Sequence, residues 1–278
     1  MEKVYSLLSW NVEHFKKSSN DHVNQRVKRI TQAIMKEDPD VFAIYEVEGK
    51  DIFEEMVKNF SAYSFHITEG PQTQEILVAV KGTITSFYTQ KVSFKSGINI
   101  LRPGALLTLH IDGENYPILF LHLKSKNDAR SFGLRDDMLT KAIKFSKSLK
   151  TDKPANYLFI GDLNTMGLNY YFDRDIPAET ELRKSDNYAQ RYYKLQRLPK
   201  TFPNTYNNGS NSSYPQSNLD HCYAAQHLKF KLFNNKDDSS NLSPIDVRGW
   251  VDFQSSQEQD QWIEDYSDHA YLYLEVVK

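Results

Sequence analysis

Apolar positions in this chain follow two patterns, the spacing of an amphipathic helix and the short run of a strand, and the two patterns alternate along its length. In residues 22–38, apolar side chains recur on one helix face, with Asn20 or Asp21 as the N-cap and Pro39 as the stop. Further helices are predicted at 50–60, 132–149 and 178–197. Short apolar runs predict strands at 4–10, 41–46, 76–80, 84–88, 106–111, 118–123, 156–160 and 271–277.

The connections between these elements bear on the fold class. Residues 156–160 are nearly all apolar, which predicts a central strand covered on both faces. The Asp-Gly-Glu-Asn run at 112–115 predicts a hairpin turn, whereas 204–218 and 236–241 predict polar loops. The alternation of strands and helices predicts an α/β fold. Because the candidate residues come from both halves, one domain over residues 1–278 is the simplest organisation.

Composition narrows the classes of function. A formal charge of -2 and a pI near 6.5 argue against a dedicated nucleic-acid-binding module. They leave room for an enzyme whose bound metal supplies local charge. Cys222 is the only cysteine, which excludes an intramolecular disulfide and a thiolate zinc site, and we expect it to be a buried thiol.

The chain carries no recognisable targeting segment. It begins directly with a strand-like run and has no basic stretch followed by a long apolar one, so no secretory signal is expected. No apolar run approaches the roughly 20 residues of a membrane span. A cytoplasmic protein without a membrane span is therefore the expectation, although the mature form of an exported protein would look the same.

Polar side chains stand at the ends of five apolar runs spread over the whole chain. The segments are Ser9-Trp10-Asn11, Ile44-Tyr45-Glu46, Leu121-His122-Leu123-Lys124-Ser125, Gly161-Asp162-Leu163-Asn164 and Ser267-Asp268-His269. A strand that ends in such a group delivers it to the rim of a sheet, and five in order suggest one polar site. Hard oxygen ligands and imidazoles are typical of a magnesium-assisted reaction at phosphate.

The segment Asp268-His269 offers an imidazole that can move protons near neutral pH. Neighbours on an extended chain point to opposite faces, so Asp268 is not expected to hold His269 directly. Asp220, which starts another strand-like run, is the best candidate to orient His269. The ordinary alternative is a turn before the last strand.

Asp162 and Asn164 follow the strand that is predicted to be the most buried. Asp162 would position a nucleophile or bind metal, and Asn164 would donate to a phosphoryl oxygen. The alternative is a strand-to-loop turn, because Gly, Asp and Asn all favour turns. Glu46 and Asn11 are metal-ligand candidates, since a carboxylate at the end of an apolar strand is costly unless paired. Both are also compatible with ordinary turn positions.

Four further polar residues fit a phosphate site. His122 ends an apolar strand and is followed by Lys124 and Lys126, which would serve phosphate. Arg102 precedes Pro-Gly and a strand, where it would clamp a phosphate oxygen through two N–H groups. The alternatives are a core histidine, solvated lysines and a loop arginine.

Taken in order, these segments resemble the endonuclease/exonuclease/phosphatase superfamily, which has a pancreatic-deoxyribonuclease-like fold. The Gly-Asp-x-Asn motif at 161–164 and the Ser-Asp-His motif at 267–269 carry most of the resemblance, which runs from Asn11 to His269. It implies an α/β (α+β) four-layer sandwich of two mixed β-sheets flanked by helices, with the active site at one edge.

The resemblance also implies a role for each of these residues in the hydrolysis of a phosphoester bond. Glu46 matches the family's metal-binding Glu, with Asn11 beside it and Asp268 as a further metal or site carboxylate. His269 matches the histidine that contacts the scissile phosphate, and Asp220 matches the carboxylate that orients it.

The remaining positions complete the implied set. Asp162 and Asn164 match the pair that aligns the water and stabilises the transition state. His122 matches the second histidine of the deoxyribonuclease and sphingomyelinase branches, and its acidic partner is expected to be Glu75. Arg102 matches a phosphate contact that many relatives carry in an Arg-Pro pair.

Three departures narrow the resemblance. Tyr45 stands where the family often has Gln before the metal-binding Glu. His-Leu-Lys-Ser-Lys at 122–126 replaces the Asn-x-Tyr-x-Pro-Asn-Gly stretch of abasic-site endonucleases, and looks more like bacterial nuclease-type and deadenylase-like members. Ser-Asn-Leu-Asp-His at 217–221 replaces the Asp-Arg-Ile signature of inositol-polyphosphate 5-phosphatases.

The main hypothesis is a Mg²⁺-dependent phosphodiesterase, with Mn²⁺ as a substitute metal, and a nuclease acting on DNA or RNA is the first choice of substrate class. A phosphatase or phospholipid phosphodiesterase of the same superfamily is the second hypothesis. A catalytically silent binding protein on the same fold is the third. Tyr206 in the polar loop would either stack on a base or pack within the loop.

Overall fold

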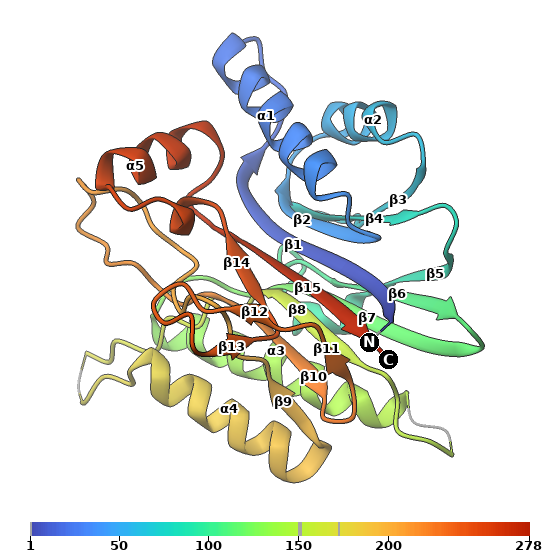
Figure 1. Ribbon diagram of the computed structural model, residues 1–278. Coiled ribbons are helices and arrows are strands. Elements are labelled where there is room, and N and C mark those ends of the chain that lie inside the picture. Colours follow the sequence, from blue (N-terminus) through green and yellow to red (C-terminus); the bar gives the residue numbers. More distant parts are fainter. Residues whose placement is uncertain (1, 150–151, 172) are drawn as a thin grey trace. The chain divides into compact units, whose positions relative to one another are not determined.

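The computed structural model describes residues 2–149, 152–171 and 173–278 (Figure 1). Contacts between Cα atoms divide the chain into two compact units. Unit 1 comprises Met1–Thr85, Pro199–Asn218 and Lys229–Lys278, and unit 2 comprises Ser86–Leu198 and Leu219–Leu228. Each unit holds one large sheet with its own helices.

Unit 1 is built on a mixed seven-stranded sheet in the order β11-β15-β1-β2-β4-β3, with β14 also paired to β15. Strand β1 runs parallel to β2 and antiparallel to β15, so the first and last strands of the chain are neighbours (Figure 1). The strands are β1 (Lys3–Phe15), β2 (Val41–Val47), β3 (Tyr63–Ile67), β4 (Glu75–Lys81), β11 (Lys229–Phe230), β14 (Asp246–Arg248) and β15 (Tyr271–Val277). A separate two-stranded ladder joins β12 (Phe233–Asn234) to β13 (Leu242–Ser243).

The helices of unit 1 are α1 (Asp21–Glu37), α2 (Lys50–Asn59), α5 (Ser256–Asp265) and the short η2 (Trp250–Asp252). Helices α1 and α2 lie over the same part of the sheet (Figure 1). The side chain of Asn20 caps α1 by accepting from the backbone N–H of His22 at 2.9 Å. Apolar residues at helical spacing on α1 are buried in one cluster with Phe42, Ile44 and Leu77 of the sheet. Full burial of one such side chain contributes about 1.5–3 kcal/mol.

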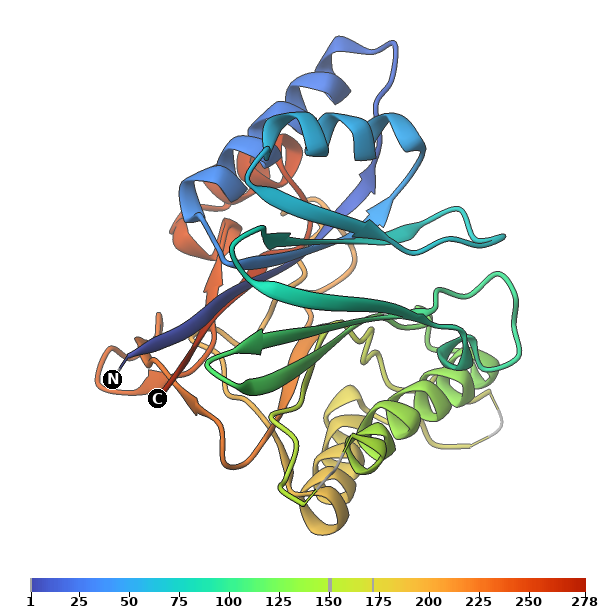
Figure 2. The ribbon, with the colours of Figure 1, turned by 90° about the vertical axis from the view of Figure 1, so that its right-hand side faces the viewer.

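Unit 2 is built on a mixed six-stranded sheet in the order β5-β6-β7-β8-β10-β9. Strands β7 and β8 are parallel, whereas the pairs β6–β7, β8–β10 and β10–β9 are antiparallel. The strands are β5 (Thr85–Lys91), β6 (Gly104–Ile111), β7 (Glu114–His122), β8 (Leu158–Asp162), β9 (Leu195–Arg197) and β10 (Asp220–Ala225). The helices are η1 (Val92–Lys95), α3 (Ala129–Ser148) and α4 (Ala178–Tyr193). Figure 2 shows α3 and α4 lying next to each other beside this sheet.

The main sequence predictions for the fold are confirmed. Two mixed sheets flanked by helices are present, and β8 is buried at every position. Asp112 and Gly113 have φ values of 51° and 78°, as required by the predicted tight hairpin turn between β6 and β7. Cys222 is fully buried and unpaired, and its burial raises the pKa of its thiol above the ordinary value.

Three element predictions need correction. The helix predicted at 178–197 ends at Tyr193, because Lys194 adopts a left-handed conformation with a φ of 53° and Leu195 then pairs with Ala225 in β9. Strand β1 runs five residues past the predicted end at Trp10, to Phe15. Helix α5 was not predicted.

Among the described residues, no helix is both long and apolar enough to cross a bilayer. The assignment of residues 1–278 to one domain stays a prediction.

Candidate active site

Each unit carries its own set of candidate residues. In unit 1, the set lies where β1 and β2 bulge. Asn11 pairs with Tyr45, and the next pair is Phe15 with Val47, so three residues of β1 stand opposite Glu46 alone. Glu13, His14 and Glu46 all have positive φ values, of 41°, 47° and 63°. Bulges of this kind re-aim a side chain, and non-glycine residues in this region store strain that is frequent at functional sites.

The carboxylate of Glu46 is held from three sides. Asn11 Nδ2 donates to Oε1 at 3.2 Å, Gln74 Nε2 donates to Oε2 at 2.7 Å, and the backbone N–H of His14 donates to Oε2 at 3.2 Å. Asn11 is buried, with 2% of its surface exposed, and its Oδ1 accepts from the backbone N–H of Glu13 at 3.1 Å. The structure therefore brings the predicted pair Asn11 and Glu46 together.

The segment that carries Asp268 and His269 is attached to the end of β1. Ser267 Oγ donates to the carbonyl of Asn11 at 2.8 Å, and Trp10 Nε1 donates to the carbonyl of His269 at 2.8 Å. The ring of Tyr206 meets the ring of His269 edge-on, with centroids 5.2 Å apart. His269 is 5% exposed. This contact places the Tyr206 ring beside a candidate site residue, and both alternatives for Tyr206, base stacking and packing within the loop, stay predictions.

Asp268 lies in the field of other carboxylates. The pKa of Asp268 is raised to about 6, and burial is the largest cause. The charge of His269 lowers this pKa, those of Glu13 and Glu46 raise it, and that of Arg26 lowers it. The backbone of Asp268 is fixed through its carbonyl, which accepts from the N–H of Asn207 at 2.9 Å. Glu46 and Asp268 thus form a patch in unit 1 in which negative charge exceeds the nearby positive charge.

Two residues near Glu46 were missed by sequence reasoning. His14 Nδ1 contacts Glu48 Oε1 at 2.5 Å, and this hydrogen bond is the main cause that raises the pKa of His14. Gln74 lies in the loop before β4 and donates to Glu46. Nothing in their local sequence marks them, because the bulge that brings His14 beside Glu46 has no glycine or proline.

In unit 2, the candidate residues follow the parallel strands β7 and β8. His122 is the last residue of β7 and Asp162 the last of β8, and the two are register partners. His122 Nε2 lies 3.5 Å from Asp162 Oδ2, and each residue is at most 3% exposed. Neighbouring parallel strands place their carboxyl ends at the same edge of a sheet, which explains why residues 40 apart meet.

Asn164 is held against Asp162 by the turn that follows β8. Its backbone N–H donates to Asp162 Oδ1 at 3.0 Å, and its side-chain Nδ2 donates to the carbonyl of Leu123 at 3.2 Å. Its φ of 50° lies in the left-handed region. One Nδ2 hydrogen of Asn164 is engaged by the protein, so this side chain is fixed in orientation.

Positive charge gathers at the segment after β7. The pKa of Lys124 is lowered by burial first and then by the charges of Lys126 and Arg102, so both of these cations act on Lys124. Lys124 Nζ donates to the carbonyl of Ser125 at 3.1 Å. Arg102 thus lies within electrostatic reach of Lys124, and the role of both as phosphate contacts stays a prediction.

Two further predictions concern residues in strands of different units. Asp220 starts β10 as predicted, is 3% exposed and pairs with Asp162 across the sheet. Its role in orienting His269 stays a prediction. Glu75 starts β4, and its Oε2 accepts from Thr68 Oγ1 at 2.5 Å and from Gln72 Nε2 at 2.7 Å. Its role as the partner of His122 also stays a prediction.

Gly167, three residues after Asn164, is placed where a side chain does not fit. Its φ is 71°, and an added Cβ would lie 2.2 Å from the carbonyl oxygen of Ile176. We expect Gly167→Ala to lower the free energy of unfolding by about 3 kcal/mol or more, from backbone strain and overpacking together. Gly113→Ala is the matched control, because its φ of 78° is similar but no atom lies within 4 Å of the added Cβ.

Urea unfolding of both variants measures this difference. The strain of a left-handed alanine alone costs about 1–2 kcal/mol, which is the loss expected for Gly113→Ala. Equal losses for the two variants would contradict the view that the turn after β8 is packed too tightly for a side chain.

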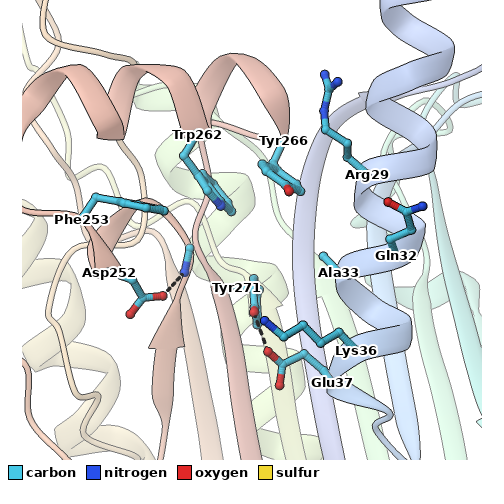
Figure 3. Close-up of a pocket in the computed structure, with 11 residues that line it drawn as sticks. Arg29, Gln32, Ala33, Lys36, Glu37, Asp252, Phe253, Trp262, Tyr266 and Tyr271 are labelled. Atoms are coloured by element: carbon cyan, nitrogen blue, oxygen red, sulfur yellow. Dashed lines mark hydrogen bonds between the residues drawn. The ribbon is translucent and has the colours of Figure 1, made fainter.

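A hollow of about 290 Å³ lies elsewhere in unit 1, between α1, α5 and β15 (Figure 3). Trp262, Tyr266 and Tyr271 face it, and Lys36 points toward it (Figure 3). Its carboxylates are already engaged; Glu37 Oε1, for example, accepts from the hydroxyl of Tyr271 at 2.8 Å. None of the candidate residues lines this hollow, so it is not the site that the sequence predicted.

The donor set of unit 1 fits a hard divalent cation. Over the described residues, no group of three or more His, Cys, Asp or Glu side chains converges as a ready-made cage. Magnesium does not need one, because it usually keeps several waters and binds through one or two carboxylates. Glu46 and Asp268 supply the carboxylates and Asn11 an amide oxygen, and their surplus negative charge is what such an ion would offset.

Comparison with solved structures gives close agreement over the whole chain. TDP2 of D. rerio, in a crystal structure complexed with single strand DNA product, matches with a TM-score of 0.68 and 15% sequence identity, covering 99% of this chain and 99% of that chain. A mannosyl-6-phosphatase of Bacteroides thetaiotaomicron VPI-5482 matches with a TM-score of 0.61 and 15% identity, covering 99% of this chain and 100% of that chain.

An endonuclease/exonuclease/phosphatase family protein from Bacteroides thetaiotaomicron also matches, with a TM-score of 0.59 and 14% identity over 98% of this chain and 97% of that chain. No protein-family model matches the sequence, and no curated protein matches it. At these identities, the agreement concerns the fold. The chain shares with these proteins the deoxyribonuclease-like fold of two mixed β-sheets flanked by helices, which the resemblance implied.

Proposed function

We propose that this protein is a divalent-metal-dependent phosphodiesterase, and that its substrate is nucleic acid. The observation that carries the proposal is the group at the ends of β7 and β8, where buried Asp162 is hydrogen-bonded to Asn164 and lies 3.5 Å from His122. The cations Lys124 and Arg102 belong to the same unit. A fixed carboxylate, an imidazole and nearby cations are what hydrolysis of a phosphoester requires.

A Mg²⁺ ion would be held by Glu46, with Asn11 and Asp268 as further ligands, and Mn²⁺ would substitute for it. When bound, the metal would supply positive charge that stabilises the developing negative charge on phosphoryl oxygens. The hydrogen bonds from Asn11, Gln74 and the His14 backbone fix the direction of the Glu46 carboxylate before any ion binds. Such preorganisation reduces the cost of binding.

The protein groups would divide the remaining work. Asp162 would accept the proton of the attacking water, and Asn164 would align that water and donate to a phosphoryl oxygen. His269, oriented by Asp220, and His122, with Glu75 as its acidic partner, would donate hydrogen bonds to phosphoryl oxygens and a proton to the leaving group. Arg102 and Lys124 would bind the phosphate.

Nucleic acid is preferred as the substrate class for two reasons. Lys124 and Lys126 extend directly from the strand that ends in His122, where a phosphate backbone would pass. The fold is shared with a TDP2 structure that contains a DNA product. A small phosphomonoester is the second candidate, because the mannosyl-6-phosphatase has the same fold over its full length.

Hydrolysis of a substrate panel tests the proposal. Purified protein would be incubated, with Mg²⁺ and with a chelator, with single-stranded DNA, duplex DNA, RNA, a sugar phosphate and a phospholipid. We expect Mg²⁺-dependent cleavage of one class of polynucleotide, restored by Mn²⁺ and abolished by the chelator.

Glu46→Gln is expected to raise the Mg²⁺ concentration needed for half-maximal rate by about tenfold or more, since it removes the negative ligand.

Glu48→Gln is the matched control for Glu46→Gln. It removes a carboxylate two residues away on the same segment, which holds His14 and Lys16 rather than Asn11. It should leave the Mg²⁺ dependence within about twofold of the unaltered protein, because an exposed ion pair contributes little. Cleavage of only the sugar phosphate would select the phosphatase alternative. Silence on every substrate, with no binding of Mg²⁺, would favour the binding-protein hypothesis.

A further inference from the structure

We propose that Arg135, paired with Glu181, is a positioning residue that fixes the two backbone segments carrying the candidate catalytic groups of unit 2. Arg135 lies on α3 and Glu181 on α4, 46 residues apart in the sequence. The segments they hold follow His122 on one side and Asn164 on the other. This inference rests on the proposed function, because it assigns the segments a role in that reaction.

All five N–H groups of Arg135 have an acceptor. Nε donates to Glu181 Oε1 at 2.7 Å, and Nη2 donates to Glu181 Oε2 at 3.0 Å and to the carbonyl of Gly167 at 2.8 Å. Nη1 donates to the carbonyls of Lys124 at 3.2 Å and of Lys126 at 2.6 Å. Only arginine presents five donors in a fixed plane, so no other side chain can make this set of bonds.

Glu181 completes the arrangement. Its Oε2 also accepts from the backbone N–H of Gly167 at 2.8 Å, so both polar backbone groups of Gly167 are bound by the pair. Arg135 is 1% exposed and Glu181 is 4% exposed. A buried pair of this kind contributes little net stability compared with apolar residues of similar volume, and therefore calls for another explanation of its presence.

The bonds reach the candidate groups by short stretches of backbone. Lys124 comes two residues after His122, and Gly167 comes three residues after Asn164. Between these points the two segments also hold each other, because the N–H of Leu123 donates to the carbonyl of Asp162 at 2.9 Å and Asn164 Nδ2 donates to the carbonyl of Leu123. Movement of the Lys124 carbonyl or of the Gly167 carbonyl would therefore shift Asp162 and Asn164.

The decisive variant is the double replacement of Arg135→Met with Glu181→Leu. Removal of both charges avoids an unpaired buried ion and is compatible with a stable fold. It also abolishes every bond from Arg135 to the carbonyls of Lys124, Lys126 and Gly167. We expect amide hydrogen exchange in 123–127 and 163–168 to accelerate by about tenfold or more. We expect kcat to fall by about a hundredfold, because catalytic groups held in the wrong position stabilise the transition state less. We expect KM to change by less than about threefold, because these groups contribute mainly to the transition state and not to substrate binding.

The charge-swapped pair Arg135→Glu with Glu181→Arg separates positioning from simple ion pairing. It keeps a salt bridge but turns a carboxylate toward carbonyl oxygens, so it should not restore kcat. Arg197→Met is the matched control, because Arg197 makes a similar two-pronged pair with Asp186 of α4 but contacts neither segment. It should leave exchange in both segments and kcat unchanged.

Arg135→Lys is a second variant in case the double variant does not fold. It keeps the charge but not the five donors, and the same acceleration of exchange is expected. Unchanged exchange in both segments, or a restored kcat in the charge-swapped protein, would overturn the inference. If the unaltered protein hydrolyses no phosphoester, the proposed function fails, and the exchange measurement still decides whether the pair holds the two segments.

Discussion

Replacement of Asp162 by asparagine is expected to lower kcat by about a thousandfold, which corresponds to about 4 kcal/mol of activation free energy. Asp162 is 2% exposed, and its two oxygens face different partners. Oδ1 accepts from the backbone N–H of Asn164, and Oδ2 lies 3.5 Å from His122 Nε2. An amide of the same shape preserves the packing but cannot accept a proton from water, so the loss concerns chemistry and not folding.

Steady-state kinetics on the best substrate of the panel, together with thermal unfolding, measure this effect. Asp186→Asn is the matched control, because Asp186 is also a carboxylate of unit 2 that accepts several hydrogen bonds, from Arg197 and from the hydroxyl of Tyr223. We expect Asp186→Asn to reduce stability but to leave kcat within about threefold. A fall of less than about tenfold in Asp162→Asn would contradict the assignment of Asp162 as the proton acceptor.

The strand-end residues could be read from the sequence because strand ends are visible as the end of an apolar run. His122 and Asp162 end β7 and β8, and Asp220 begins β10, within two residues of where the hydrophobic pattern placed the strand ends. Their grouping within unit 2 then follows from the pairing of β8 with β7 and with β10. Local pattern identified the residues, and strand order brought them together.

The bulge at Glu46 could not be predicted in the same way. Glu13, His14 and Glu46 adopt positive φ values without glycine or proline in the segment, so the local sequence gives no turn signal. The conformation is instead held by long-range hydrogen bonds, such as those from Asn11 and Gln74 to the Glu46 carboxylate. The prediction that β1 stops at Trp10 failed for the same reason, since alternation of apolar and polar residues breaks at the bulge.

The Arg135–Glu181 pair was invisible to sequence reasoning for a different reason. Both residues lie in helices, and charged residues are rarely fully buried, so the sequence gives no reason to place either of them in the interior. Only the packing of α3 beside α4 turns Arg135 inward, where three backbone carbonyls accept its donors. A single sequence carries no signal of a buried ion pair whose partners are 46 residues apart.

Removal of the imidazole of His269 is the second change with a large expected effect. We expect His269→Ala to lower kcat by about a thousandfold, because the proposed hydrogen bond to a phosphoryl oxygen strengthens as charge develops in the transition state. His269 is 5% exposed, and its backbone is fixed by Trp10 Nε1 at its carbonyl and by Ser267 Oγ at its N–H. These main-chain bonds do not depend on the imidazole, so the segment should keep its place in the variant.

Two controls distinguish lost chemistry from lost packing in His269→Ala. Tyr206→Leu removes the ring that meets His269 edge-on, at 5.2 Å between centroids, but leaves the imidazole in place. It should lower kcat by about tenfold at most, since one aromatic contact contributes about 0.5–1.5 kcal/mol. His66→Ala removes a half-buried imidazole of the same unit on β3 and should leave kcat unchanged.

Addition of free imidazole gives the sharpest discrimination for His269. If the lost group acts at the phosphate, a small imidazole that enters the vacated space should recover part of the rate in His269→Ala and none in Tyr206→Leu. If His269 merely packs against Tyr206, the two variants should lose similar activity and neither should respond. That second outcome would exclude His269 from the chemistry and would leave His122, beside Asp162 in unit 2, as the imidazole to test for proton transfer.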